Sequence, residues 1–274
     1  MYKRLIARLD IKNHYLVKGI NFEGLRVLGL PYDFSKKYFD DGIDEIHYQD
    51  VVASLYGRNS LGQTIEETVK NIFVTFGVSG GIRTIADIDR MLNFGADKIS
   101  LNTAAVRNPK LIEQAVKKFG SSTICINIDA IYRNINNYEV LIESGREKTN
   151  KNLFVWLEEI QKLGAGEICL TSINYEGKQK GFDIELYKRI KEEVSIPIIA
   201  HGGCGNLTHL LEVFEYVDAV SIASFLHYSY LSKFDQKLPN AGNLSFLNFQ
   251  KKNEVNLTIQ EIKDYLRKNR INVR

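Results

Sequence analysis

The stretch RLIARLD (residues 4–10) decides the fold, because a close counterpart, TICINID (residues 123–129), follows it 119 residues later. Both read as short, mostly apolar strands that end in an aspartate. A second pair, Gly80-Gly81 and Gly202-Gly203, recurs at an offset of 122 residues. A long period shared by unrelated signals is typical of an internal duplication. The sequence therefore predicts a chain of two similar halves.

Short apolar runs alternate with amphipathic stretches along the whole chain. The predicted strands cover residues 5–9, 45–49, 73–78, 98–101, 124–128, 167–171, 196–200 and 219–222. Strands that alternate with helices pair in parallel, and two equal halves close most simply into a barrel. We predict an α/β fold, a (β/α)8 TIM barrel built of two (βα)4 half-barrels, with a doubly wound open sheet as the alternative.

Composition and length favour one ordinary globular domain. The 274 residues are 44% hydrophobic and 25% charged, so we expect a single barrel over residues 1–274. The polar segment 228–256 is predicted to be a surface insertion before a last helix at 258–269. The net charge of +3 gives no reason to expect nucleic acid. Because no apolar run approaches a membrane span, and the cysteines lack ligand spacing, we expect a cytoplasmic protein with reduced thiols.

Polar residues at the predicted strand ends are the candidates for chemistry, because barrels of this kind hold their sites there. The duplication places Asp10 and Asp129 on opposite sides of the barrel mouth. Two carboxylates in different surroundings can divide base and acid roles, whereas a single strand-end aspartate is more often a cap. The five histidines lie on separate elements without ligand spacing. We expect no metal and no cofactor.

Glycine pairs at two strand ends suggest anion sites. Gly80-Gly81 precedes Asn102-Thr103, and the same order returns as Gly202-Gly203 and Ala223-Ser224. Glycine lets backbone N–H groups approach a phosphate closely, and a following helix N-terminus favours negative charge. The alternative is that the glycines only form tight turns. Two phosphate sites across one mouth would imply a small-molecule substrate with a phosphate at each end.

These residues resemble the HisF family, the cyclase subunits of imidazole glycerol phosphate synthase. The resemblance rests on RLIARLDIKNHYLVKG (4–19), GIDEIHYQDVVAS (42–54), VSGGIR (78–83), GADKISLNTAAVRNP (95–109), INIDA (126–130), GAGEICLTSI (164–173), IPIIAHGG (196–203) and DAVSIAS (218–224). It implies a barrel that receives ammonia from a glutaminase subunit docked at its N-terminal face. The substrate would be a bisphosphorylated ribulosyl-imidazolecarboxamide, cleaved to imidazole glycerol phosphate and an aminoimidazole carboxamide ribonucleotide.

The resemblance also implies a role for individual residues. Asp10 and Asp129 match the catalytic carboxylates. The positions that match substrate or phosphate contacts are Lys18, Gly81, Asn102, Thr103, Thr171, Gly177, Gly203, Ala223 and Ser224. The positions that match a charged ring where ammonia enters are Arg4, Glu45, Lys98 and Glu167. A salt-bridge layer at the barrel bottom is the structural alternative for that ring.

Several departures from the family pattern gather at the substrate face. Arg8 replaces a usual cysteine, His201 replaces serine, and Glu176 lies in a segment that differs from the usual D-x-D-G-T. Tyr56 and Arg58 are new in the loop after the second strand, and segment 228–256 is added. We expect these positions to alter specificity, since an arginine at the mouth changes both charge and bulk.

Three functions remain open from the sequence. The departures favour a HisF-like paralogue that works with a glutaminase to supply ammonia for amidation of surface-polysaccharide sugars. A sugar amidotransferase would then be a further partner. The alternative is a cyclase subunit of the histidine pathway that acts on the parental substrate. A non-catalytic binding protein is the third reading.

Overall fold

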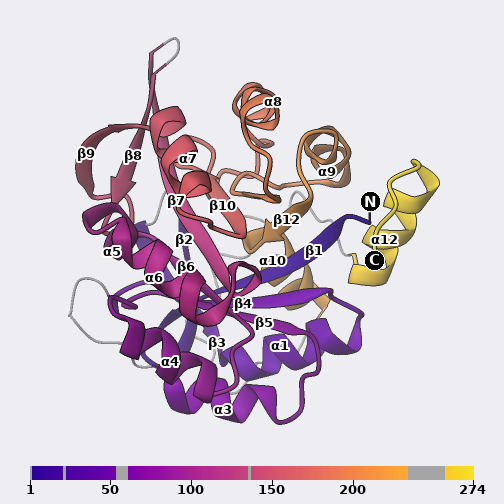
Figure 1. Ribbon diagram of the computed structural model, residues 1–274. Helices are drawn as coiled ribbons and strands as arrows, with labels where there is room; N and C mark the ends of the chain where they lie inside the picture. Colours follow the sequence, from indigo (N-terminus) through magenta and orange to yellow (C-terminus); the bar gives the residue numbers. More distant parts are fainter. Residues whose placement is uncertain (1, 21–22, 54–60, 135–136, 234–256) are drawn as a thin grey trace.

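The computed structural model describes residues 2–20, 23–53, 61–134, 137–233 and 257–274. A closed barrel of parallel strands lies at its centre, with helices around the outside (Figure 1). Among these residues, no helix is long and apolar enough to cross a membrane. The predicted (β/α)8 barrel is confirmed.

The barrel closes through one continuous ladder of parallel strands. Its strands are β1 (Arg4–Lys12), β4 (Glu45–Asp50), β5 (Thr75–Ser79), β6 (Lys98–Leu101), β7 (Ile124–Asn134), β10 (Glu167–Ser172), β11 (Ile198–His201) and β12 (Ala219–Ile222). β12 pairs with β1, and β10 pairs with both β11 and β7. Because three strands separate β1 from β7 in either direction, these two strands face each other across the barrel.

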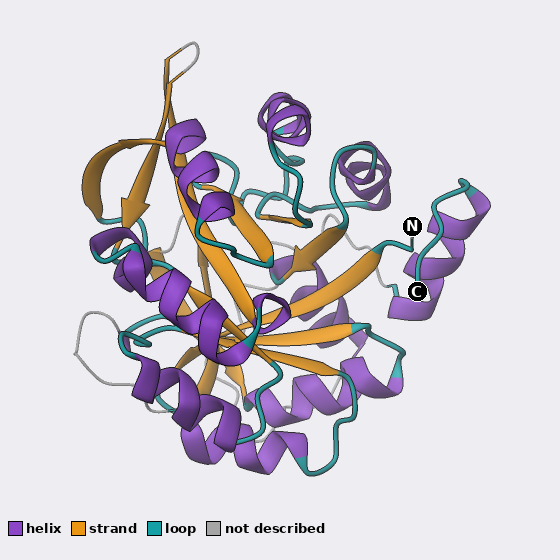
Figure 2. Cartoon of the chain, viewed as in Figure 1, coloured by secondary structure: helices purple, strands orange, loops and turns teal. Residues whose placement is uncertain are grey.

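Helices cover the outside of the barrel (Figure 2). They are α1 (Pro31–Asp40), α3 (Gly62–Val69), α4 (Ile85–Asn93), α5 (Thr103–Arg107), α6 (Lys110–Phe119), α7 (Leu153–Lys162), α8 (Ile184–Glu193), α9 (Leu207–Phe214), α10 (Ser224–Lys233) and α12 (Ile259–Lys268). A single-turn 3-10 helix, η1, spans Ser121–Thr123. Thr84 begins α4 with a capping box, and Thr258 begins α12 in the same way. The apolar faces of these helices pack on the outward side chains of the strands and form the main core.

Two antiparallel hairpins were not predicted, and they extend the duplication. β2 (Tyr15–Ile20) and β3 (Glu23–Gly29) follow β1, whereas β8 (Asn137–Ile142) and β9 (Glu147–Asn152) follow β7. β2 and β8 begin 122 residues apart, which matches the offset of the glycine pairs. Each half-barrel therefore folds a hairpin over the mouth directly after its first strand.

The predicted insertion 228–256 begins too early. Residues 228–233 complete helix α10, where Leu231 is buried and Tyr228 and Tyr230 pack on the core. The rest of that segment, 234–256, lies outside the described residues, so the prediction for it stays a prediction.

The inner side of the barrel is unusually polar. Along β1, Leu5, Ala7 and Leu9 pack outward into the main core, so the alternate positions point inward. A small apolar layer inside the barrel includes Ile6, Cys125 and Cys169. Barrel interiors are normally filled by branched apolar side chains. Polar side chains lie on both sides of this apolar layer along the barrel axis, and they indicate a function for the interior.

Gly166 is expected to be essential for stability, because it lies against backbone. A Cβ added there would lie 2.0 Å from the carbonyl oxygen of Ser121, whereas one added at Gly24 would meet no atom within 4 Å. Gly24→Ala should cost only about 1–2 kcal/mol for its left-handed backbone. We expect Gly166→Ala to cost clearly more in urea unfolding. Equal losses for the two variants would contradict this packing.

Candidate functional site: a barrel mouth and a charged ring at opposite ends

The N-terminal end of the barrel carries a closed ring of ion pairs. Its members are the first residues of β1, β4, β6 and β10, namely Arg4, Glu45, Lys98 and Glu167. Arg4 donates to Glu45 at 2.5 Å and also pairs with Glu167. Lys98 lies 3.0 Å from Glu167 and 3.3 Å from Glu45. The four residues predicted at this end are therefore brought together, and we call them the charged ring.

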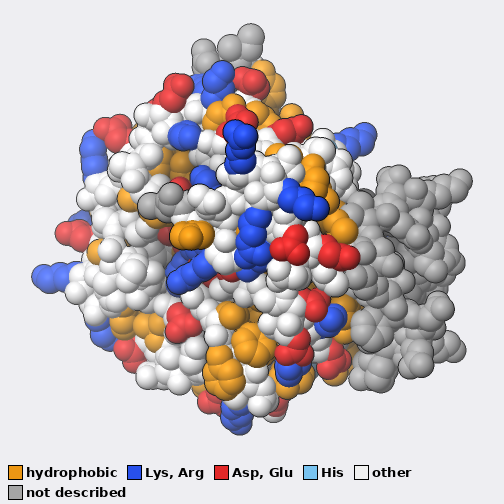
Figure 3. All heavy atoms as spheres, turned by 90° about the vertical axis from the view of Figure 1, so that its right-hand side faces the viewer, with side chains coloured by type: hydrophobic (Ala, Val, Ile, Leu, Met, Phe, Trp, Pro, Cys, Tyr) orange, Lys and Arg blue, Asp and Glu red, His pale blue; other side chains and the backbone are white. Residues whose placement is uncertain are grey.

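An apolar groove lies at the same end. It has a volume of about 510 Å³ and is lined mainly by residues 69–76, together with Gly95 and Asp97. Phe73 leaves 77% of its surface exposed here, and Tyr2, just before β1, leaves 69%. Figure 3, which views the end where the strands begin, shows charged side chains near the middle of the face and hydrophobic ones below them.

Asp10, at the opposite end, is held by two cations. Its carboxylate accepts from Arg8 Nε and from Lys18 Nζ, both at 3.0 Å. Lys18 lies on β2 and donates also to Glu176 at 2.6 Å. All four side chains are buried. Burial alone would raise the pKa of Asp10, but Lys18 and Arg8 outweigh it and hold that pKa well below its usual range.

Asp129, on the facing strand β7, has the opposite character. Asn102 Nδ2 donates to its carboxylate at 2.8 Å, and the Thr171 hydroxyl also bonds to it. Burial raises the pKa of Asp129 to about 6, against the opposing charge of Arg8. The predicted pair of carboxylates therefore occupies facing strands, with one permanently ionised and one able to carry a proton near neutral pH.

Two neutral histidines line the barrel near Arg8. His201 Nδ1 lies 2.9 Å from the carbonyl oxygen of Ser221, so this nitrogen carries the proton and donates. Burial, together with the charge of Arg8, holds the pKa of His201 well below its usual value. The same two causes lower the pKa of His47 to about 3. His47 fits only because Gly77 has no side chain: a Cβ there would lie 2.5 Å from His47 Nδ1.

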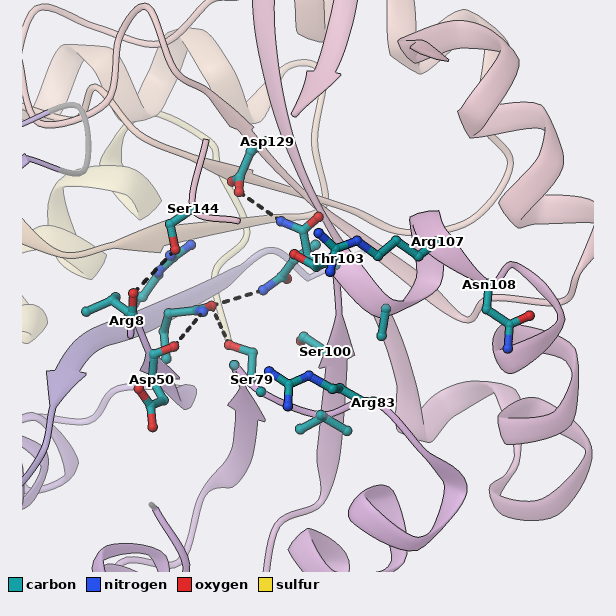
Figure 4. A pocket seen from close by; sticks show the side chains of 18 residues that line it. Arg8, Asp50, Ser79, Arg83, Ser100, Thr103, Arg107, Asn108, Asp129 and Ser144 are labelled. Atoms are coloured by element: carbon teal, nitrogen blue, oxygen red, sulfur yellow. Dashed lines mark hydrogen bonds between the residues drawn. The ribbon is translucent and has the colours of Figure 1, made fainter. Parts of the chain in front are cut away.

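The open part of the mouth is a pocket of about 260 Å³, which we call the mouth pocket. Figure 4 shows Asp129 at one side, Arg107 extending toward Thr103, and Arg83 below Ser100. The predicted residues that line it are Arg8, Gly81, Asn102, Thr103 and Asp129. Gly80 and Gly81 both have left-handed backbones, with φ values of 95° and 67°. The first predicted phosphate site is thus open and lies between two arginines.

The second predicted phosphate site is covered. The loop between β10 and α8 lies on Gly203, where a Cβ would come within 1.9 Å of the carbonyl oxygen of Gly181. Gly181 N–H also donates to the carbonyl oxygen of Gly203 at 2.9 Å. Ala223 and Ser224 are only 5% and 9% exposed. None of these residues lines the mouth pocket. Five further residues predicted to contact substrate or to alter specificity also lie outside the lining of the mouth pocket: Lys18, Thr171, Glu176, Gly177 and His201.

Several residues around the mouth pocket were missed from the sequence. Arg83 and Arg107 come from the segments that follow Gly81 and Thr103. Ser144 comes from the β8–β9 turn, where Thr103 Oγ accepts from the backbone N–H of Glu143 at 3.1 Å. The signal that could have found this turn is Glu143-Ser144-Gly145, a turn-forming run that follows the strand-like stretch Asn137–Ile142. Polar Asn127, two residues before Asp129, was the available sign of a polar interior.

Some predictions fall on residues that the structure leaves out, or concern metal and cysteine chemistry. Tyr56 and Arg58 lie outside the described residues. In the described part of the chain, no group of three or more histidine, cysteine or acidic side chains could hold a metal ion. Cys125, Cys169 and Cys204 are free and buried, as expected for core thiols.

Comparison with known proteins identifies the family. The sequence profile of the family described as "Histidine biosynthesis protein" matches residues 4–232. The "Imidazole glycerol phosphate synthase subunit HisF" of Legionella pneumophila is 48% identical over 205 residues, which is 74% of this chain and 96% of that protein. Proteins of the same name from Campylobacter concisus and Sulfurisphaera tokodaii are 44% and 43% identical, each over 82% of this chain and 90% of theirs. With a barrel duplicated in two halves, a charged ring at one end and paired aspartates at the other, this chain belongs to the HisF family.

Proposed function

We propose that this chain is the cyclase subunit of imidazole glycerol phosphate synthase. It would take ammonia at the charged ring and add it, at the mouth, to a bisphosphorylated ribulosyl-imidazolecarboxamide. The observation that carries the proposal is the order of three features through the barrel: a ring of ion pairs, a cavity inside the barrel, and a mouth pocket lined by Asp129, with Asp10 on the facing strand. The names of the relatives support the same reaction.

The mouth supplies the groups that such a reaction needs. The first phosphate would bind at Gly80-Gly81 and Thr103, which line the mouth pocket together with Arg83 and Arg107, whose positive charge suits an anion. Asp129, with a pKa of about 6, would donate and accept the proton that moves during ring closure. Asp10 would stay ionised and stabilise the positive charge of the iminium that forms when ammonia adds to the substrate carbonyl and water leaves.

Admission of the second phosphate requires the covered half of the mouth to open. Lys18 and Glu176 hold the β2 strand and the β10–α8 loop together at 2.6 Å. A phosphate has the charge to replace Glu176 as the partner of Lys18. Exchange of that ion pair for a phosphate pair would uncover Gly203, Ala223 and Ser224.

The partner proposed for the ring end is a glutaminase of the HisH type. The charged ring offers complementary pairs of both signs, and the apolar groove beside Phe73 offers surface that a partner can bury. Phe73 and Tyr2 are large, exposed hydrophobic side chains at the end of the barrel where the strands begin, and a partner seated there would bury them. A glutaminase seated there would release ammonia directly above the barrel axis.

A second candidate function is favoured by the surroundings of Asp10. Arg8 and Lys18 both neutralise this carboxylate, and the second phosphate site is covered. A subunit that passes ammonia to a separate sugar amidotransferase, in the assembly of surface polysaccharides, would need the ring and the interior but not a bisphosphate site.

Steady-state turnover separates the two functions. The purified chain is assayed with ammonium chloride and the bisphosphorylated parental substrate, followed by release of imidazole glycerol phosphate. The cyclase proposal expects turnover that Asp10→Asn abolishes. Absence of turnover, with the glutaminase stimulated only when a sugar-modifying enzyme is present, would favour the second candidate.

A further inference from the structure

The barrel holds a second, internal cavity that nearly meets the mouth pocket. Its volume is about 20 Å³, and its lining runs from Glu45, Lys98 and Glu167 of the charged ring up to Arg8. A space of this size holds about one molecule of water or ammonia. We call it the interior cavity.

Three residues line both the interior cavity and the mouth pocket: Arg8, Ser100 and Asn127. They come from β1, β6 and β7, and each is at least nine-tenths buried. The shared lining makes these side chains the boundary between the interior cavity and the mouth pocket. We call them the constriction.

The hydrogen-bonding groups of the constriction are partly unused. Asn127 Nδ2 donates to Gln49 Oε1 at 3.3 Å, and Ser79 also donates to that oxygen. This arrangement leaves Asn127 Oδ1 as a buried acceptor that no described donor reaches. Arg8 uses Nε for Asp10, and its terminal amino groups make no hydrogen bond within the described part of the chain.

The two unused groups are complementary to neutral ammonia. Ammonia has three N–H donors and one lone pair, so it can donate to Asn127 Oδ1 and accept from Arg8 at the same time. Ammonium has no lone pair, and it would meet the permanent positive charge of Arg8. An apolar constriction would offer neither interaction. A buried acceptor without a donor is also costly unless a guest satisfies it.

We propose that Arg8, Ser100 and Asn127 form an ammonia-binding constriction, in which Asn127 Oδ1 accepts a hydrogen bond from neutral ammonia as it enters the mouth. The inference rests on the proposed function, because it needs a nitrogen source at the ring and an acceptor substrate in the mouth. Asn127 is then a positioning residue for ammonia, and it touches the nitrogen before bond formation.

The test compares two nitrogen sources in the complex with the glutaminase. Asn127→Leu removes the acceptor with little change of volume. For each variant we take the ratio of product formed from glutamine to product formed from ammonium chloride at pH 8.5. We expect this ratio to be at least tenfold lower in Asn127→Leu than in the wild type. Glutamine hydrolysis should continue, so free ammonia should accumulate. Asn108→Leu makes the same exchange at the rim of the mouth pocket, outside the interior cavity, and should keep the wild-type ratio.

A wild-type ratio in Asn127→Leu would overturn the inference. If that variant does not fold, Ser100→Ala tests the same constriction with the same ratio, because it removes the hydroxyl without adding bulk. A wild-type complex that makes product from neither nitrogen source would instead overturn the proposed function. The two failures are therefore distinguishable.

Discussion

Asp129→Asn is expected to remove turnover and, at alkaline pH, to stabilise the fold. As the proton carrier, Asp129 should contribute about 10²–10⁴-fold to kcat. Its pKa is raised by burial to about 6, so the folded protein binds a proton that the unfolded chain has already lost. The buried charge therefore lowers the free energy of unfolding as the pH rises from about 4. The loss is complete above about pH 6 and is on the order of 3 kcal/mol.

The measurements are turnover and urea unfolding at pH 5 and pH 8. The asparagine keeps an acceptor for Asn102, so we expect Asp129→Asn to be stabilised at pH 8 more than at pH 5, by on the order of 1–2 kcal/mol. Asp87→Asn is the matched control for stability; Asp87 belongs to the capping box of α4, and its carboxylate accepts from the backbone N–H of Arg83. Burial raises the pKa of Asp87, but hydrogen bonds from Arg83 and Thr84 lower it by a larger amount, so the pKa lies below its usual value.

The control should behave in the opposite way. Because the pKa of Asp87 is lowered in the fold, its contribution is present at pH 8 and lost as the pH falls through the acid range. Asp87→Asn should cost about 1 kcal/mol through the weakened capping box. Full activity in Asp129→Asn, or a destabilisation at pH 8, would contradict the role given to Asp129.

Glu167→Ala is expected to separate the two nitrogen sources at the other end of the barrel. Glu167 accepts from both Arg4 and Lys98, so its removal leaves two cations with Glu45 as their only partner in the charged ring. If ammonia enters there, glutamine-dependent activity should fall by about tenfold or more, whereas activity with added ammonia should fall less than about threefold.

The same assay on Glu158→Gln is the control, because Glu158 forms an exposed pair with Lys162 on α7, away from both ends. It should change neither activity, since such pairs contribute little. Equal loss of both activities in Glu167→Ala would show that the charged ring is only a structural salt-bridge layer.

The sequence predicted the barrel because its repeat and its apolar strands are local signals. Alternation of strand and helix, with Asp10 and Asp129 at equivalent strand ends, was enough to place both aspartates across the mouth. The charged ring was predicted only from the resemblance to the HisF family, and the structure places each of its members at the start of a strand.

What the sequence did not predict depends on long-range contacts. The hairpin strand β9, with the sequence EKTNKN, is polar and exposed, and its pairing with β8 decides its conformation. The covered second phosphate site depends on Glu176 reaching Lys18, 158 residues away in the chain. The constriction depends on which side of β7 faces inward, and only the closed barrel shows that Asn127 lines the same two cavities as Arg8.

The central claim is that ammonia travels inside the barrel from the charged ring to the mouth. Isotope competition tests it most directly: the glutaminase complex receives glutamine labelled with ¹⁵N at the amide, together with an excess of unlabelled ammonium chloride. Passage through the barrel predicts imidazole glycerol phosphate that carries mostly ¹⁵N. Product whose label follows the composition of the bulk ammonia would contradict the account.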